Sequence, residues 1–460
     1  MKRINPKSIL IILIGLAIAF LGYQLRKQQF SSFPPINDTG DEYKYAFNGI
    51  SLIKKGVPES WSWWSNYGEF PLKNFRGTEF RMVKPYFDEP PLFGLMMGSY
   101  AISKGMDYYD KVDAGALRWP MLKIGALNVF LLFILIYLVS GLKEAIVASL
   151  LYATIPTIVL SSRMPFAENI MISVLLLCLL CLHFFLRNNS KTLLVLFSII
   201  SGSAVLMKQI GVYIPITLFL ILLSQKKYKP TITIAVSSII FFGIWLVYGY
   251  HYNWELFIHL QQTFSGRELY LPTMVINLFD TFRIAEKMMS SDGLLIFSWV
   301  SLAVFPLIFG NMKSKSKLPG LIVGISSGIY LLLLSISSGH LKGWYRYPLF
   351  PFACWAAGVM FLRILENPKF LSSFFFVSLA FFGSYISGNG EHNFSRLQVR
   401  VFQFIFPLIM TPFLLNEIFG QENFGKKIKI ISKATLLIIF ILIIVMNMRA
   451  IYLYQDQFWY

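Results

Sequence analysis

Long apolar runs recur along the whole chain, and they constrain its fold more than any other feature. Residues 124–139 and 434–446, for example, are almost continuously apolar. Because the hydrocarbon of a bilayer offers the backbone no hydrogen-bond partner, a segment that crosses it must be a helix or a strand of a closed barrel. These runs lack the strict alternation of barrel strands, and the pattern therefore favours helices.

About thirteen segments are long and apolar enough to be expected to cross a membrane. They are residues 8–24, 117–139, 144–160, 166–186, 192–207, 209–224, 231–250, 293–310, 318–338, 345–362, 370–387, 400–418 and 431–450. Only 14% of the residues are charged, against about 25% in soluble domains. The sequence predicts an all-α polytopic membrane protein, a single transmembrane domain over residues 1–460 with no soluble C-terminal domain.

The charges indicate an orientation. Lys2, Arg3 and Lys7 precede the first apolar run, and no small-x-small cleavage site follows it, so we expect an uncleaved anchor with a cytoplasmic N-terminus. The short loops on that side then carry most of the excess Lys and Arg, as the positive-inside rule requires. The net charge of +18 is therefore chiefly a topology signal, and nucleic acid is excluded as a partner.

Two outer segments are too long to be simple connections. These are the first extracytoplasmic loop, residues 25–116, and the second, residues 251–292. Both are rich in aromatic residues, which argues against disorder. The Trp-rich run 61–64 and the amphipathic stretch 43–53 predict helices that lie flat in the membrane interface.

Carboxylates are concentrated in the first of these loops. Eleven of the 23 in the chain fall within residues 38–113. Two acidic pairs adjoin expected helix starts: Asp41-Glu42 and Asp88-Glu89. Each pair is either a helix cap or part of a site that handles protons, hydroxyls or cations at the membrane surface.

Several short motifs follow one another in a recognisable order. They are Asp41-Glu42-x-x-Tyr45-Ala46, Tyr86-Phe87-Asp88-Glu89-Pro90-Pro91-Leu92, Leu117-Arg118-Trp119-Pro120, Ser162-Arg163-Met164-Pro165-Phe166-Ala167-Glu168, Met207-Lys208-Gln209-x-Gly211 and Arg346-Tyr347-Pro348-x-x-Pro351. Together they resemble the bacterial protein O-mannosyltransferase and lipid A aminoarabinose transferase group. These are C-type (GT-C) glycosyltransferases that use polyprenyl-phosphate-linked sugars. The group often has Lys or His where this chain has Glu89.

The resemblance implies an inverting transferase in the bacterial inner membrane, with its active site on the extracytoplasmic side. It makes Asp41 the general base for an acceptor hydroxyl, which agrees with the position of Asp41 just outside the first span. The other catalytic candidates are Glu42, Asp88 and Glu89. Candidates for binding the lipid phosphate are Lys208, Arg346, Lys84 and Arg267, and those for the donor and acceptor cavity are Tyr45, Tyr86, Arg163, Glu168, Tyr345 and Tyr347.

Simpler roles remain open for some of these residues. Lys208 divides two apolar runs at an outer turn, where an ammonium either meets an anion or extends to the interface. Arg346 either grips phosphate or anchors the interface beside its aromatic neighbours. Arg163 and Glu168 are close enough in sequence to pair with each other.

The expected partners are a polyprenyl-phosphate sugar, membrane lipids, and a lipid-linked, glycan or protein acceptor. The sequence requires no cofactor; it supports neither a metal site nor the divalent cation that some related transferases use. A transporter or lipid flippase is the first alternative, but the charges lie at the outer edge rather than in mid-membrane. An O-antigen polymerase or ligase is the second. The sequence identifies neither the sugar nor the acceptor, whether lipid A, O-antigen, wall polymer or protein.

Overall fold

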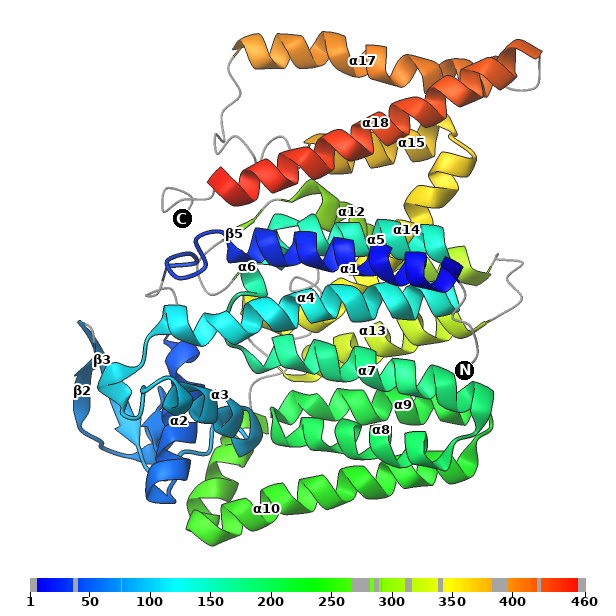
Figure 1. Ribbon diagram of the computed structural model, residues 1–460. Helices are drawn as coiled ribbons and strands as arrows, with labels where there is room; N and C mark the ends of the chain where they lie inside the picture. Colours follow the sequence, from blue (N-terminus) through cyan, green and yellow to red (C-terminus); the bar gives the residue numbers. More distant parts are fainter. Residues whose placement is uncertain are drawn as a thin grey trace.

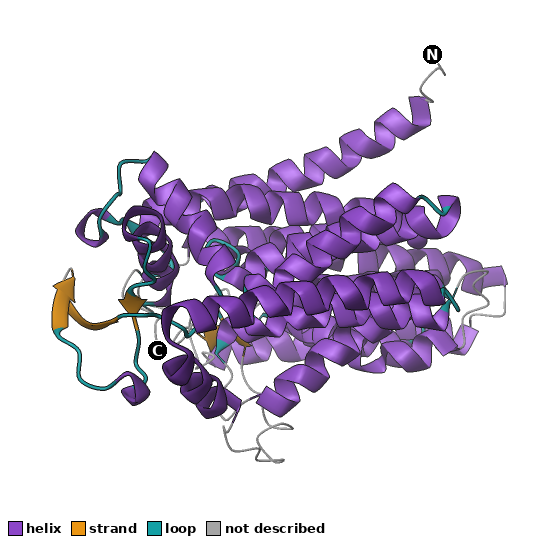
Figure 2. Cartoon of the chain, turned by 90° about the horizontal axis from the view of Figure 1, so that it is seen from below, coloured by secondary structure: helices purple, strands orange, loops and turns teal. Residues whose placement is uncertain are grey.

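The structure is a bundle of helices with a folded loop region at one end (Figure 1). It is a computed structural model that describes residues 6–35, 40–75, 77–265, 282–284, 289–290, 292–310, 317–337, 342–382, 396–419 and 423–453. A view from below shows long helices running side by side, with the strands gathered at the end that carries the loops (Figure 2).

Seven stretches of helix within the described ranges are long and apolar enough to cross a membrane. They belong to α1 (Pro6–Lys27), α4 (Ala114–Val139), α7 (Ala167–Asn188), α10 (Tyr228–Ser265), α13 (Leu318–Ser337), η5 (Gly343–Leu349) joined to α14 (Phe350–Glu366), and α18 (Asn423–Leu453). The expectation of a helical polytopic membrane protein is therefore confirmed.

Other helical pieces occupy the remaining expected spans. They are α5 (Leu142–Thr154), α6 (Pro156–Ser161), α8 (Lys191–Ser203), η3 (Ala204–Leu206), η4 (Gln209–Val212), α9 (Tyr213–Ser224), α12 (Gly293–Gly310), α15 (Phe370–Phe376), the π-helix η6 (Val377–Phe382) and α17 (Arg396–Phe419). Pro156 separates α5 from α6, because the residue before a proline is driven out of the helical region. That all thirteen segments cross the membrane remains a prediction.

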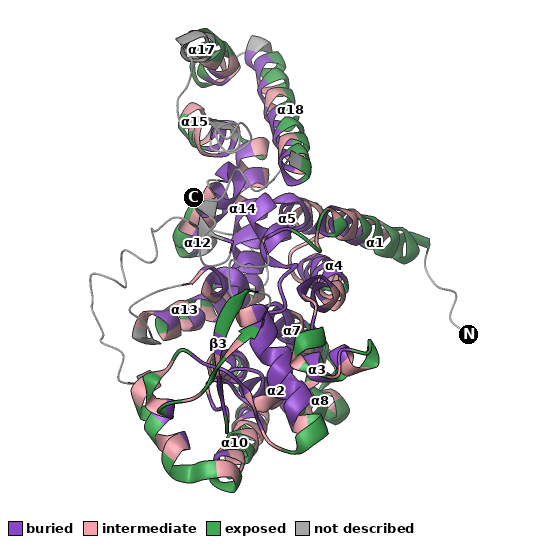
Figure 3. Cartoon of the chain, turned by 90° about the vertical axis from the view of Figure 1, so that its left-hand side faces the viewer, coloured by how far each residue is buried: buried purple, intermediate pink, exposed green. Residues whose placement is uncertain are grey.

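Burial separates central helices from peripheral ones. The apolar window of α7 is 78% buried, whereas that of α10 is 17% buried. Figure 3 shows buried residues gathered in the middle of the bundle and exposed ones along its rim. Ile239 and Val247 on α10 are largely exposed, as expected of a helix that faces lipid rather than water.

The first long loop, residues 25–116, folds into helices and a small sheet. Its elements are α2 (Asp41–Lys55), β1 (Ser60–Trp61), η1 (Ser65–Tyr67), β2 (Leu72–Phe75), β3 (Thr78–Val83), α3 (Pro91–Ser103) and η2 (Tyr109–Lys111). The strands are antiparallel in the order β1-β3-β2. Gly77, with a φ of 82°, lies in the β2–β3 turn, a conformation that favours glycine.

One expectation for this loop was wrong, and another is confirmed as far as the helix is concerned. Residues 61–64 are not an interfacial helix: Trp61 is buried in β1 opposite Met82, and only Trp63 is largely exposed. The helix α2 does form, but every residue from Glu42 to Ser51 is buried. The apolar side chains of α2 therefore pack inside the protein over these residues, and its last turn, with Ile53, is exposed. That this end lies in the membrane interface stays a prediction.

Close packing of α2 against α3 fixes the geometry of the loop. A Cβ atom on Gly49 would overlap the carbonyl oxygen of Gly94, and one on Gly98 would overlap the backbone of Gly49. The two helices therefore approach until their backbones touch. This contact holds the start of α2 near the segment that precedes α3.

The second outer segment begins as a continuation of α10. The backbone of Asn253 is not helical, and its side chain accepts a hydrogen bond from the N–H of Leu256, which restarts the helix after the kink. Beyond the kink, Phe257 packs against Phe87, with ring centroids 5.5 Å apart. The described start of the second long segment, residues 251–265, therefore packs on the first long loop.

Candidate functional site

Asp41 of the first acidic pair and Glu89 of the second come near the same lysine because α2 and α3 are in contact. Asp41 and Glu42 form the first turn of α2, and Asp88 and Glu89 come directly before Pro90 and α3. Neither helix has a side-chain cap hydrogen bond, so simple capping does not explain these carboxylates.

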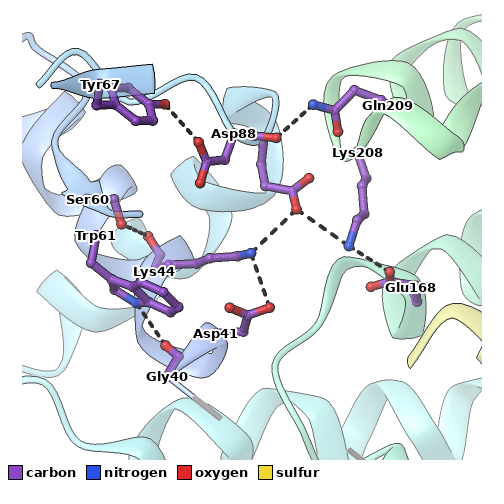
Figure 4. A network of polar contacts seen from close by, with 11 residues as sticks. Gly40, Asp41, Lys44, Ser60, Trp61, Tyr67, Asp88, Glu168, Lys208 and Gln209 are labelled. Atoms are coloured by element: carbon purple, nitrogen blue, oxygen red, sulfur yellow. Dashed lines mark hydrogen bonds and ion pairs between the residues drawn. The ribbon is translucent and has the colours of Figure 1, made fainter. Parts of the chain in front are cut away.

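A chain of alternating charges runs from the loop into the bundle (Figure 4). It consists of Asp41, Lys44, Glu89, Lys208 and Glu168, and we call it the charge chain. Lys44 Nζ lies 3.2 Å from Asp41 Oδ2 and 3.6 Å from Glu89 Oε1. Lys208 Nζ lies 3.5 Å from the same Glu89 oxygen and 2.7 Å from Glu168 Oε1.

Lys208 joins the bundle half of the charge chain to the loop half. It lies between η3 and η4, is nearly buried, and has its Nζ 5.2 Å from the centre of the Tyr345 ring. Burial lowers the pKa of the ammonium, but Glu168 and Glu89 outweigh burial and hold the pKa above its usual range. The side chain is therefore a cation held inside the protein, not one extended to the interface.

Asp88 lies beside the charge chain and has its own partners. Its Oδ1 accepts a 2.8 Å hydrogen bond from the Tyr67 hydroxyl, and its carbonyl oxygen accepts one of 2.7 Å from Gln209. Burial raises its pKa to about 6, against the opposing effect of Lys44. Burial thus favours the neutral form of Asp88, whereas Lys44 and the Tyr67 hydroxyl favour the ionised form.

Glu42 points elsewhere, into a buried pair with Arg118. Both of its oxygens accept bonds from the guanidinium, at 2.7 and 2.5 Å, and both side chains are fully buried. The same guanidinium donates to the carbonyl of Phe30. This pair ties α2 to α4 and leaves Asp41 as the acid of the first pair that lies on the charge chain.

Two of the aromatic candidates, Tyr45 and Tyr86, lie beside these charges, and Tyr347 has another partner. Tyr45 is buried, and its ring centre lies 5.3 Å from Lys44 Nζ. Tyr86 is fully buried, and burial followed by the charges of Asp88 and Glu89 raises its pKa. Tyr347 donates a hydrogen bond to the carbonyl oxygen of Ile284 instead.

The basic candidates divide into two groups. Arg346 is buried in η5, next to the tyrosine that packs on Lys208. Lys84, in contrast, is exposed and its charge acts on Glu59, so it is not on the charge chain. Arg163 donates to the carbonyl oxygens of Phe33 and Leu25 rather than to Glu168. Arg267 lies outside the described residues.

Lys44 is the member of the charge chain that the sequence analysis missed. A signal was available, because Lys44 follows Asp41 by three residues on a helix, a spacing that places the two side chains on one face. The acidic pair and the amphipathic pattern of residues 43–53 do not by themselves single out Lys44. Among the residues that the structure describes, no three His, Cys, Asp or Glu side chains form a group that could hold a metal ion.

Known proteins resemble this chain in sequence and in fold. Residues 88–248, about a third of the chain, match the dolichyl-phosphate-mannose-protein mannosyltransferase family. No curated protein matches this chain in sequence. The structure is similar to that of ArnT from Cupriavidus metallidurans bound to undecaprenyl phosphate, with a TM-score of 0.52 and 15% identity, covering 97% of this chain and 76% of that one.

Two further solved structures match less closely. ArnT from the same organism in the apo state has a TM-score of 0.49 and 14% identity, over 96% of this chain and 77% of that one. The archaeal oligosaccharyltransferase AglB from Archaeoglobus fulgidus, in complex with an inhibitory peptide and a dolichol-phosphate, has a TM-score of 0.45 and 11% identity, over 94% and 56%.

Proposed function

We propose that this chain is a GT-C glycosyltransferase that transfers a sugar from a polyprenyl-phosphate-linked donor to an acceptor hydroxyl, as its family match and its fold support. The family resemblance drawn from the motifs is confirmed by the match over residues 88–248. Undecaprenyl phosphate is bound in the ArnT structure of similar fold, which supports a lipid of that class as the donor's carrier here. We place the reaction on the extracytoplasmic face, from the distribution of Lys and Arg among the loops.

The charge chain is the observation that carries this proposal. Sugar transfer needs a carboxylate to take a proton and cations to meet a departing phosphate. Asp41 lies within 3.2 Å of Lys44, and Glu89 connects Lys44 to Lys208. Both kinds of group are thus present within a few ångströms of one another, between the outer loop and the bundle.

In the proposed reaction the acceptor oxygen attacks the anomeric carbon from the side opposite the phosphate. The new carbon–oxygen bond forms as the bond from that carbon to the phosphate oxygen breaks, which inverts the configuration. Asp41 takes the hydroxyl proton, and the bonding electrons leave with the polyprenyl phosphate. Lys44 and Lys208 stabilise the charge on the departing phosphate, and Arg346 is a further candidate for that role.

Asp88 has a separate role in this proposal. Because it is held by Tyr67 and lies one residue from the charge chain, it is suited to accept a hydrogen bond from the acceptor and orient it. Glu42 is assigned a structural role with Arg118. Lys84, which is exposed, and Arg267, which lies outside the described residues, remain candidates for contacting the lipid phosphate.

The direct test is to incubate the purified protein with a panel of polyprenyl-phosphate sugars and candidate acceptors. We expect at least one donor to release polyprenyl phosphate in an amount equal to the glycosylated product. The anomeric configuration of that product should be opposite to that of the donor. Retained configuration would contradict direct displacement, and release of a polyprenyl diphosphate would contradict the donor class.

A further inference from the structure

Glu89 occupies a position that the charge balance does not require. Each lysine of the charge chain already has a closer carboxylate, Asp41 for Lys44 at 3.2 Å and Glu168 for Lys208 at 2.7 Å. The chain therefore carries three carboxylates against two ammonium groups. An excess buried charge is costly unless something offsets it.

The contacts of Glu89 are also unusual for an ion pair. A single oxygen, Oε1, faces both ammonium groups, at 3.6 Å from Lys44 and 3.5 Å from Lys208. The other oxygen, Oε2, is buried and has no hydrogen-bond partner among the residues that the structure describes. Charge-assisted N–H···O bonds are shorter, about 2.7–2.9 Å. Glu89 is thus held between two cations without a close bond to either.

A phosphate oxygen bound at the position of Glu89 Oε1 would likewise be an anion between two ammonium groups. Resting on the proposed function, we infer that Glu89 is an internal counter-ion that holds the position of the donor phosphate between Lys44 and Lys208 until that phosphate displaces it. Without such a counter-ion the two ammonium groups would repel each other in a site of low dielectric constant. With it, the cations are kept in place before the donor arrives.

The negative charge of Glu89 also discriminates among lipid phosphates. The donor is a phosphate diester with a single negative charge, whereas the released polyprenyl phosphate is a monoester with close to two at neutral pH. Repulsion by Glu89 grows with the charge of the anion that replaces it. Glu89 therefore weakens product binding more than donor binding, and it disfavours polyprenyl diphosphates for the same reason.

The test is the affinity of undecaprenyl phosphate for the purified protein with Glu89→Gln, which removes the charge and keeps the size. We expect the variant to bind this lipid about tenfold more tightly than wild type. Its affinity for the methyl diester of undecaprenyl phosphate, which mimics the donor, should rise less. Glu59→Gln is the matched control, because Glu59 is an acid of the same loop that pairs with Lys55 and Lys73 instead. It should leave both affinities unchanged.

Equal or weaker binding of undecaprenyl phosphate by Glu89→Gln would overturn the inference while leaving the proposed function intact. If that variant does not fold, wild type alone still decides the matter. It should bind the methyl diester at least as tightly as the monoester, and a clear preference for the monoester would overturn the inference. Failure of wild type to bind either lipid would contradict the inference and the proposed function together.

Discussion

Lys208 Nζ lies 2.7 Å from Oε1 of Glu168, so the turn between η3 and η4 is bonded to the first turn of α7. The side chains of Lys208 and Glu168 are both buried. The contact gives Lys208 two functions, since the side chain both connects helices and presents a cation to the charge chain. Its substitution should therefore affect stability and ligand binding together.

Lys208→Met should weaken binding of polyprenyl phosphate by tenfold or more, because one of the two cations facing Glu89 is lost. It should also lower the free energy of unfolding by roughly 3–5 kcal/mol, since Glu168 is left buried without its partner. Ligand binding and thermal unfolding in detergent measure the two effects. Lys208→Arg, which keeps the charge, should retain more of the lipid affinity and more of the stability than Lys208→Met. If Lys208→Met bound polyprenyl phosphate as tightly as wild type, Lys208 would not be a phosphate-binding residue.

Glu42→Gln should act through stability. Its carboxylate forms a fully buried bidentate pair with Arg118, and breaking such a pair costs roughly 3–5 kcal/mol. Thermal unfolding should show this loss. The matched control is Lys111→Met, which breaks the exposed pair with Asp107 and should leave the unfolding temperature unchanged. A Glu42→Gln protein that unfolds like wild type but has lost turnover would make Glu42 a catalytic residue instead.

Gly49→Ala should reduce turnover at least tenfold, although Gly49 carries no functional group. The Cβ atom of the alanine would overlap the carbonyl oxygen of Gly94. The helix α2 must then move away from α3, which increases the distance of Asp41 and Lys44 from Glu89. Gly243→Ala is the control, because nothing lies within 4 Å of a Cβ added there. Turnover by the purified variants is the measurement. Equal turnover in both would show that the contact between α2 and α3 does not position the site.

Asp88 should give the reaction a pH dependence. Burial raises its pKa to about 6, so if the ionised form orients the acceptor, kcat/KM should rise with pH through an apparent pKa near 6. Tyr67→Phe removes a hydrogen bond that favours the ionised form and should shift this rise to higher pH. A profile that Tyr67→Phe does not shift would show that another group controls it.

The same ionisation should affect stability in a defined direction. The pKa of Asp88 is about 6 in the folded protein and about 3.9 in an unfolded chain, so the folded state binds the proton more tightly. Its contribution to stability is then fully present below about pH 4 and is lost as pH rises through about 6. Asp88→Asn should remove this component from the dependence of the unfolding temperature on pH.

The sequence predicted the helices well because a bilayer leaves a spanning backbone few alternatives. Each expected span coincides with helical structure in the described residues. The strands of the outer loop were missed, because β2 and β3 are short and carry no strict alternation. The run at residues 61–64 was misread because an exposed aromatic and a buried one look alike in sequence.

The partners within the site could not be predicted from local pattern. Glu42 bonds to Arg118 and Lys208 to Glu168, and only the packing of distant helices brings these residues together. The one local pair, Asp41 with Lys44, was visible in the helical spacing. Arg163 and Glu168, close in sequence, instead have separate partners.

The central claim is that Asp41 takes the proton while the cations of the charge chain hold the phosphate. Transfer rate and donor affinity of Asp41→Asn, measured on one preparation, test it most directly, with Asp110→Asn as a control acid of the same loop that lies in η2. The account predicts that Asp41→Asn loses about 10²–10⁴-fold in rate and still binds the donor, while the control behaves like wild type. Undiminished transfer by Asp41→Asn would contradict it.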